Sequence, residues 1–167
     1  RSESRAPRLA RKARQGAANH LDRALWLLMQ RPELWWEIDT EAHDLLADQA
    51  APYGALFGSL ERTLHEQGAM SCDSLLHEVA LDAHVDEHAR NVVERISGFH
   101  APEAVTYLKH QLELVLDHLR LREVDNELSL LFESEMVSPD IQTRTAELLQ
   151  GRSRLRAKLA QSTPLQW

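Results

Sequence analysis

The sequence predicts an all-α fold. Two observations support this prediction: the spacing of the apolar residues and the positions of the glycines. Alternation of apolar and polar residues with period two, which marks half-buried strands, is almost absent, whereas helical spacing recurs along the chain. Glycine is scarce and stands where helical segments should end. Gly68 follows a segment of about 52–67 and Gly98 follows one of about 83–97. Both glycines are therefore expected at helix C-terminal positions with positive φ.

Local signals place the ends of the individual helices. Thr40, Ser71 and Ser138 are expected as N-caps, because their hydroxyls can accept hydrogen bonds from first-turn N–H groups. Three prolines fit first helical turns, where the missing N–H is tolerated: Pro32, Pro102 and Pro139. The expected helices cover about 17–30, 32–38, 40–48, 52–67, 71–80, 83–97, 102–134 and 138–161.

The long helix expected from Pro102 carries two apolar stripes that lie roughly 160° apart around its axis. The first stripe contains Val105, Leu108, Leu112, Val115, Leu116 and Leu119, and the second contains Leu121, Val124, Leu128 and Leu131. One helix therefore buries opposite sides at its two ends, which favours a helix that leaves a bundle and becomes an arm of a hairpin. The last helix supplies the other arm, with Ile141, Leu148, Leu155 and Leu159 on one side. The predicted organisation is a basic linker (1–16), a helical bundle (17–118) and a C-terminal helical hairpin (119–167).

Composition limits the chemistry available to the chain. Its 167 residues suit one domain or one domain with an appendage, and Cys72 is its one cysteine. It can therefore form neither an internal disulfide nor a thiolate cluster for structural zinc, and a reducing cytoplasm is expected. The start Arg-Ser-Glu-Ser-Arg-Ala-Pro is typical of a linker, so we expect a fragment of a longer protein.

Charge is unevenly distributed. Residues 1–20 carry six basic side chains and one acidic one, which leaves 13 of 19 basic and 25 of 26 acidic residues for the remainder, a net charge of −12. A body this acidic repels a phosphate backbone. The basic start is interpreted as a solvated linker, or alternatively as a patch for an acidic peptide or nucleic acid.

One stretch matches a zinc-peptidase motif. His84-Val85-Asp86-Glu87-His88 has the H-x-x-E-H pattern, and on a helix its two histidines would lie one turn apart. However, His88 falls within the apolar stripe formed by Leu81, Val85, Val92 and Ile96, and no third ligand is evident. We therefore expect no metal and no catalytic residues here. Gly54 and Gly58 are expected to allow a close helix crossing, and one of Trp35 and Trp36 is expected at the surface.

The stretch Leu27-Leu28-Met29-Gln30-Arg31-Pro32-Glu33-Leu34 resembles the opening of the C-terminal domain of bacterial DnaG-type primases, where a leucine-rich helix runs into Gln-x-Pro-Glu-Leu. Further similarities follow in the family's order and extend over nearly everything after about Ala18. They comprise Leu56-Phe57-Gly58-Ser59-Leu60, Ser74-Leu75-Leu76, a long helix ending near Phe132, and the terminal stretch Leu155-Arg156-Ala157-Lys158-Leu159-Ala160-Gln161.

This resemblance implies a non-catalytic domain: a helical bundle, similar to the N-terminal domain of the replicative helicase, carrying a hairpin that docks on the collar of the hexameric DnaB-type helicase. The parent protein would be a nucleotidyltransferase that makes RNA primers at the replication fork. Zinc and magnesium would belong to its upstream domains, and no cofactor is expected in this chain. The residues expected to contact the helicase lie near the end of the hairpin's second arm: Arg152, Arg154, Leu155, Arg156, Lys158, Leu159 and Gln161.

A second partner is implied by the same resemblance. Some members of the family bind the acidic tail of single-stranded DNA-binding protein through basic residues at the first helix, and the candidates here are Arg11, Lys12, Arg14 and Arg23. Asp22 stands where the family often has a basic residue, which speaks against this second partner. The competing functional classes are a nucleic-acid-binding helical module and a metallopeptidase built on His84 and His88.

Overall fold

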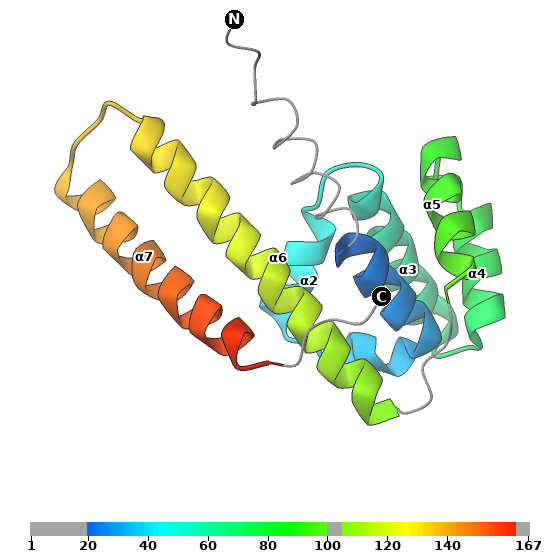
Figure 1. Cartoon of the computed structure of the whole chain (residues 1–167). Helices are drawn as coiled ribbons and strands as arrows, with labels where there is room; N and C mark the ends of the chain where they lie inside the picture. The colour runs from blue at the N-terminus through cyan, green and yellow to red at the C-terminus, as the bar shows by residue number, and fades with distance from the viewer. Residues whose placement is uncertain (1–19, 100–104, 163–167) are drawn as a thin grey trace, which may run out of the picture. The chain divides into compact units, whose positions relative to one another are not determined.

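The computed structural model describes residues 20–99 and 105–162, and in this part of the chain all regular structure is helical, which confirms the predicted fold class. The expected linker, the start of the first helix and Pro102 lie outside the described residues. The elements are a helix over 20–30, a 3₁₀ helix η1 (Pro32–Trp36), α2 (Thr40–Ala47), α3 (Tyr53–Gln67), α4 (Cys72–Leu81), α5 (Glu87–Ser97), α6 (Val105–Glu133) and α7 (Pro139–Ala160) (Figure 1).

The chain divides into two compact units, residues 1–112 and 113–167. The boundary expected from the apolar stripes was 118/119. Helix α6 crosses the observed division without a break near Leu119, so it supplies residues to both units. Its stretch from Leu114 to Leu119 is buried at every position except the half-buried His118.

The helix over 20–30 is the centre of the first unit, because every residue from Leu21 to Met29 is buried. Charged groups on a helix enclosed on all sides lose their contact with water and need partners in the protein. Two of its residues are charged, and each is accommodated locally. The guanidinium of Arg23 lies 4.5 Å from the ring centroid of Trp26, a cation–π arrangement, and burial lowers its pKa.

Asp22 joins three helices of this unit through hydrogen bonds. Its Oδ1 accepts from the Tyr53 hydroxyl of α3 at 2.6 Å, and its two oxygens accept from Arg95 of α5 at 2.8 and 3.0 Å. Burial and the hydrogen bond to Asp22 raise the pKa of Tyr53, which keeps its hydroxyl a donor. Because Asp22 is almost completely buried, these bonds fix the positions of α3 and α5 on the central helix.

Asp22→Asn should therefore lower the free energy of unfolding by about 1 kcal/mol. The amide keeps an acceptor for Tyr53 but weakens the charge-assisted bonds from Arg95, which is half exposed. Chemical denaturation measures the change, and Asp44→Asn, at an exposed carboxylate of α2, is the matched control. Equal stabilities for the two variants would contradict the proposed anchoring.

A second carboxylate, Asp82, organises the turn between α4 and α5. Its oxygens accept hydrogen bonds from Ser59 at 2.7 Å, from Arg62 at 2.9 Å, and from the backbone N–H of His84 at 2.8 Å. Burial alone would raise the pKa of Asp82, but these bonds, with a further one from the His84 ring, lower it well below its usual range. The turn is thus anchored on α3 by an ionised carboxylate.

This depressed pKa gives a signed pH dependence. The stabilisation from Asp82 is fully present above its unfolded-state pKa of about 3.9, and it is lost as pH falls below that value. Wild type should therefore exceed Asp82→Asn in stability at about pH 6, and the difference should shrink by about pH 3. Denaturant unfolding at both pH values measures this. A difference that stays constant or grows in acid would contradict the assignment.

Several local predictions are confirmed. Ser71 and Ser138 are N-caps whose hydroxyls accept from Ser74 and Ile141 N–H groups. Pro32 and Pro139 occupy first helical turns, as predicted. Gly68 ends α3 with φ of 76°.

Other local predictions are wrong. Thr40 is the first residue of α2, and its N-cap is Asp39, which accepts from the Ala42 N–H at 2.8 Å. Gly98 has φ of −83°, because α5 ends there without a left-handed residue. Helix α5 begins at Glu87, not 83, since Asp86 caps it and the preceding residues form the turn around Asp82.

Of the two glycines expected at a close helix crossing, only Gly54 lies at a close contact. A Cβ on Gly54 would lie 2.9 Å from the backbone oxygen of Ala47 and still closer to that of Gln49, so a side chain here would clash with the end of α2. At Gly58 the nearest atom is the flexible end of Arg62, at 3.5 Å. Gly54 alone therefore permits the close approach that was expected of both.

Candidate protein-interaction surface

The second unit is a helical hairpin. The part of α6 after Leu112 and the whole of α7 run antiparallel, and residues 134–138 connect them (Figure 1). The reversal is encoded locally: Ser138 caps α7 and Pro139 opens it. These two arms form the candidate interaction surface, since the resemblance assigns helicase docking to them.

Ion pairs connect the arms, with acidic residues on α6 and basic residues on α7. Nearest the connection, Glu127 accepts two hydrogen bonds from Arg144, at 2.7 and 2.8 Å. The bond from Arg144 lowers the pKa of Glu127, and the same bond raises the pKa of Arg144. Such a two-pronged pair fixes direction as well as distance, and so sets the register of the arms.

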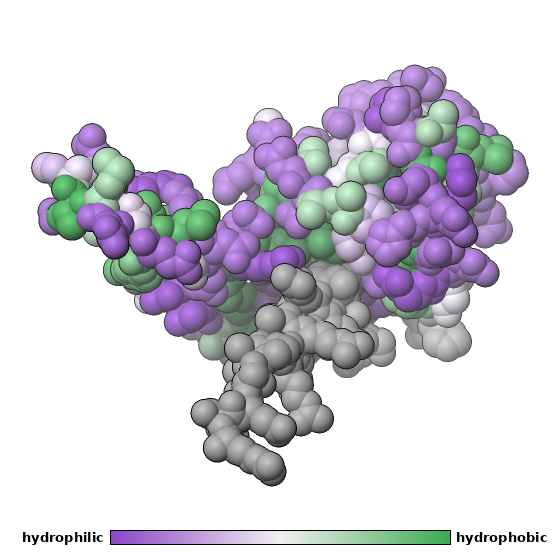
Figure 2. Space-filling view, turned by 90° about the horizontal axis from the view of Figure 1, so that it is seen from above, coloured by the Kyte–Doolittle hydropathy of each residue, from purple (hydrophilic) through white to green (hydrophobic). Residues whose placement is uncertain are grey.

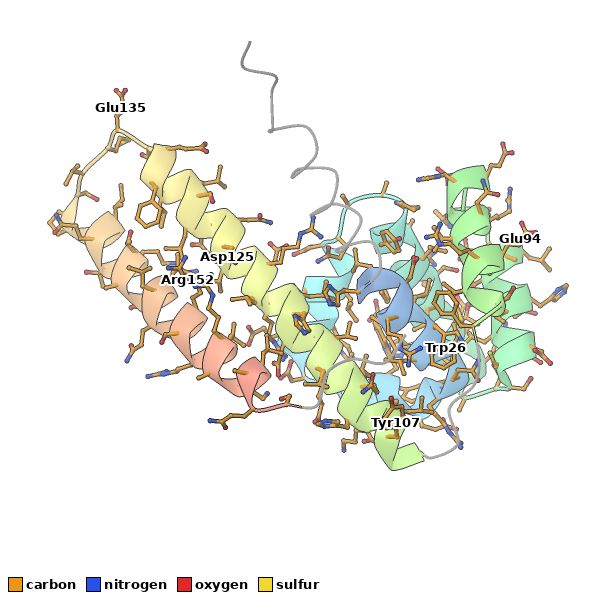
Figure 3. All side chains as sticks on the ribbon, in the orientation of Figure 1. Trp26, Glu94, Tyr107, Asp125, Glu135 and Arg152 are labelled. Carbon is orange, nitrogen blue, oxygen red and sulfur yellow. The ribbon has the colours of Figure 1, made fainter. Side chains whose placement is uncertain are left out.

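Farther along the arms, Asp125 faces two cations. Arg152 lies 3.5 Å and Arg156 lies 3.9 Å from the same carboxylate oxygen. Figure 3 shows Asp125 and Arg152 pointing toward one another between the two helices. These groups are partly exposed, so water screens the attraction and each pair contributes at most several tenths of a kcal/mol.

The third contact involves a buried charge. Asp117 of α6 has a side chain that is 3% exposed, and Lys158 Nζ of α7 lies 2.6 Å from its Oδ2. Arg120, one turn along α6, donates to its other oxygen at 3.2 Å. A carboxylate removed from water needs such partners, because an unpaired buried charge is strongly destabilising. Lys158 is thus tied to the interior of the hairpin unit.

Few apolar side chains are buried between the ends of the arms. Within residues 120–162, Leu128 and Leu148 are buried, at 1% and 6% exposure. The pairs of Glu127 with Arg144 and of Asp125 with Arg152 set a register in which Leu148 lies opposite Leu128. One fully buried leucine layer, the half-buried apolar side chains on either side of it and a row of ion pairs therefore hold the arms together, so the fully buried core of the hairpin is small.

The connected end of the hairpin exposes a group of large apolar side chains that sequence reasoning treated only as a joint. The apolar tip, as we define it, consists of Leu130 (69% exposed), Phe132 (64%), Met136 (72%) and Val137 (82%). Figure 2 shows hydrophobic surface at this end of the hairpin, bordered by hydrophilic surface. A signal existed in the sequence, since a short connection in solvent contains Met136 and Val137 without an evident structural reason.

The structure places the predicted helicase-binding residues in the second half of α7 and at its C-cap. Arg152, Arg156 and Lys158 face acidic residues of α6, whereas Arg154 is exposed and forms no ion pair with the described residues. The two leucines are partly buried and Gln161 is the C-cap. Most of the predicted cationic patch therefore has partners inside the hairpin.

Of the four residues predicted for the acidic tail, the structure describes one, Arg23. Arg23 is buried at 6% exposure and lies over Trp26, so it is not a surface cation. Arg11, Lys12 and Arg14 lie outside the described residues.

The H-x-x-E-H residues do not share a helix. His84 belongs to the turn before α5, where its ring lies 3.0 Å from Asp82, and His88 lies in the first turn of α5. His88 is exposed rather than part of the apolar stripe, because α5 begins later than expected. No three His, Cys, Asp or Glu side chains gather as a metal site anywhere in 20–99 or 105–162.

The adjacent tryptophans behave as predicted. Trp35 is 1% exposed and stacks on His43 with ring centroids 4.4 Å apart, while Trp36 is 48% exposed. His43 Nε2 also lies 2.7 Å from the backbone oxygen of Trp35. Trp35 therefore anchors η1 on α2, and Trp36 remains at the surface.

Comparison with family models, with curated proteins and with solved structures identified no match for this chain. Among the described helices, none has the length and apolar character required to cross a membrane.

Proposed function

We propose that this chain is a non-catalytic interaction domain that docks on the N-terminal collar of a hexameric DnaB-type helicase and recruits a primase to the replication fork. The observation that carries the proposal is the continuous helix α6, which belongs to a helical first unit and extends as one arm of a hairpin. The resemblance to the C-terminal domain of DnaG-type primases implies this combination. The primase would be the larger protein that contains this chain, acting in the cytoplasm.

The character of the hairpin supports a role in binding. A pair of arms with one buried leucine layer contributes little to the stability of a domain, yet it presents two long surfaces and an exposed apolar end. Exposed apolar side chains bordered by charge are typical of protein-binding surfaces.

The test is direct binding to the helicase from the same organism. The purified chain is mixed with the isolated collar domain of the helicase and analysed by size exclusion and calorimetry. Co-elution and a saturable heat signal are expected, and the helicase lacking its collar should give neither. Separate elution at tens of micromolar, on the order of the weakest affinity expected for a functional encounter, would reject the proposal.

A further inference from the structure

The strongest feature left unexplained by the fold is the apolar tip, Leu130, Phe132, Met136 and Val137. Seven large apolar side chains are exposed in the described residues, and these four fall within eight consecutive positions. The remaining three, Trp36, Leu81 and Leu149, are scattered on other elements. Scattered exposed apolar residues need no explanation, but four of them at the connected end of one hairpin do.

The tip is also acidic. Residues 129–143 contain Glu133, Glu135 and Asp140 and no lysine, arginine or histidine. All three acids are exposed, and none forms an ion pair with the described residues. Figure 3 shows Glu135 pointing out from the connection between the arms.

The contrast with the rest of the hairpin is informative. Asp117, Asp125 and Glu127 of α6 each face a cation of α7, whereas the acids of the tip face none. The nearest basic residue, Arg144, is already engaged by Glu127. Among the described residues, no cation is therefore paired with the acids of the tip, which leaves them available to a positively charged partner.

We propose that the apolar tip and its acidic rim form the docking site for a positively charged protein surface with an apolar hollow. This inference rests on the proposed function, and it assigns that surface to the helicase collar. The negative charge of the tip disfavours other partners that could cover its apolar side chains. Nucleic acid and anionic lipid head groups both repel three unpaired carboxylates. A second tip carries the same charge, so two tips do not pair.

Two pairs of variants test the apolar and acidic parts separately. Met136→Ser with Val137→Ser removes two of the most exposed apolar side chains, and Leu81→Ser, at 67% exposure in the other unit, is the matched control. Glu133→Lys with Glu135→Lys reverses the rim, and Glu94→Lys, at an exposed acid of α5, is its control. None of these side chains is buried, so folding should persist, and circular dichroism checks this.

Each protein is titrated against the collar domain and against a helical peptide of leucine and lysine, with a leucine–glutamate peptide as control. We expect both tip variants to lose roughly tenfold or more in affinity for the collar and for the basic peptide. The two control variants should bind as wild type does. Raised salt should weaken wild type more than the rim variant.

The possible outcomes separate this inference from the proposed function. If both tip variants bind the collar as tightly as wild type does, the tip is not the docking site, and the proposed function still stands. Wild type could instead bind the basic peptide through the tip but fail to bind the collar. That result would support the tip as a site for basic apolar surfaces and would overturn the assignment of its partner to a helicase. Tip-dependent self-association in sedimentation, or equal binding of the acidic peptide, overturns the inference.

Discussion

Leu148→Asp should separate the arms of the hairpin and lower helicase affinity by about tenfold or more. Leu148 is 6% exposed and lies opposite Leu128 in the register set by the ion pairs. Placing a carboxylate there costs roughly 3 kcal/mol, because the charge must either lose its hydration or force the arms apart. A hairpin with one fully buried leucine layer has little stability to absorb such a loss.

The reduction in affinity follows from the fraction of molecules that keep the hairpin closed. If docking requires the closed hairpin, the apparent Kd rises in inverse proportion to that fraction. Hydrogen exchange of the α7 amides measures opening, and calorimetry with the collar domain measures binding. The two should change together.

The adjacent residue supplies the control. Leu149 is 37% exposed, against 6% for Leu148, so Leu149→Asp introduces the same charge one position along α7 where water can reach it. Its amide protection and affinity should stay near those of wild type. Equal loss of protection in both variants would mean that Leu148 does not hold the arms, and loss of binding with full protection would place Leu148 in the interface itself.

The local structure was predictable wherever a residue and its immediate neighbours decide it. Ser71 and Ser138 cap helices because each hydroxyl meets an N–H three residues later, and Pro139 opens α7 because its ring already fixes φ. The start of α5 was missed for the opposite reason. Val85 is buried and has helical spacing relative to later apolar residues, so the sequence predicts it inside the helix. In the structure Val85 lies in the turn before α5, which the hydrogen bonds of Asp82 to Ser59 and Arg62 hold in place.

The site was less predictable because its decisive contacts join distant segments. The run of cations in α7 is visible in the sequence, but its partners are on α6, and only the register of the hairpin pairs Arg152 with Asp125 and Lys158 with Asp117. Exposure was equally hidden. Phe132 continues the helical pattern of α6 into its last turn, and the fold leaves it 64% exposed.

The cations of α7 lead to a second prediction, in which Lys158 and Arg154 behave differently. The sequence grouped both in one helicase-binding patch. In the hairpin, Lys158 pairs with the buried Asp117 at 2.6 Å, whereas Arg154 is exposed without an ion pair among the described residues. Lys158→Glu should lower the free energy of unfolding by about 2 kcal/mol. Removing one partner of a fully buried ion pair costs about 3–5 kcal/mol. We expect a smaller loss here because Lys158 is 62% exposed and Arg120 also faces Asp117.

Arg154→Glu makes the same change of charge on α7 and should leave stability within about 0.5 kcal/mol of wild type. The comparison therefore separates two reasons for a loss of binding. If cations contact the helicase directly, both variants weaken binding and both flatten its salt dependence. If Lys158 acts by holding the arms together, Lys158→Glu alone weakens binding, together with the protection of its amides.

Rescue completes this test. Asp117→Asn removes the buried charge that Lys158→Glu would otherwise oppose, so the double variant should regain most of the lost stability and affinity. Arg120 is then left facing a neutral amide near the surface, at 24% exposure, which water can satisfy. If the double variant regains full stability but no binding, Lys158 contacts the helicase directly. Rescue of both would assign Lys158 to the closure of the hairpin and leave the docking contact to the apolar tip.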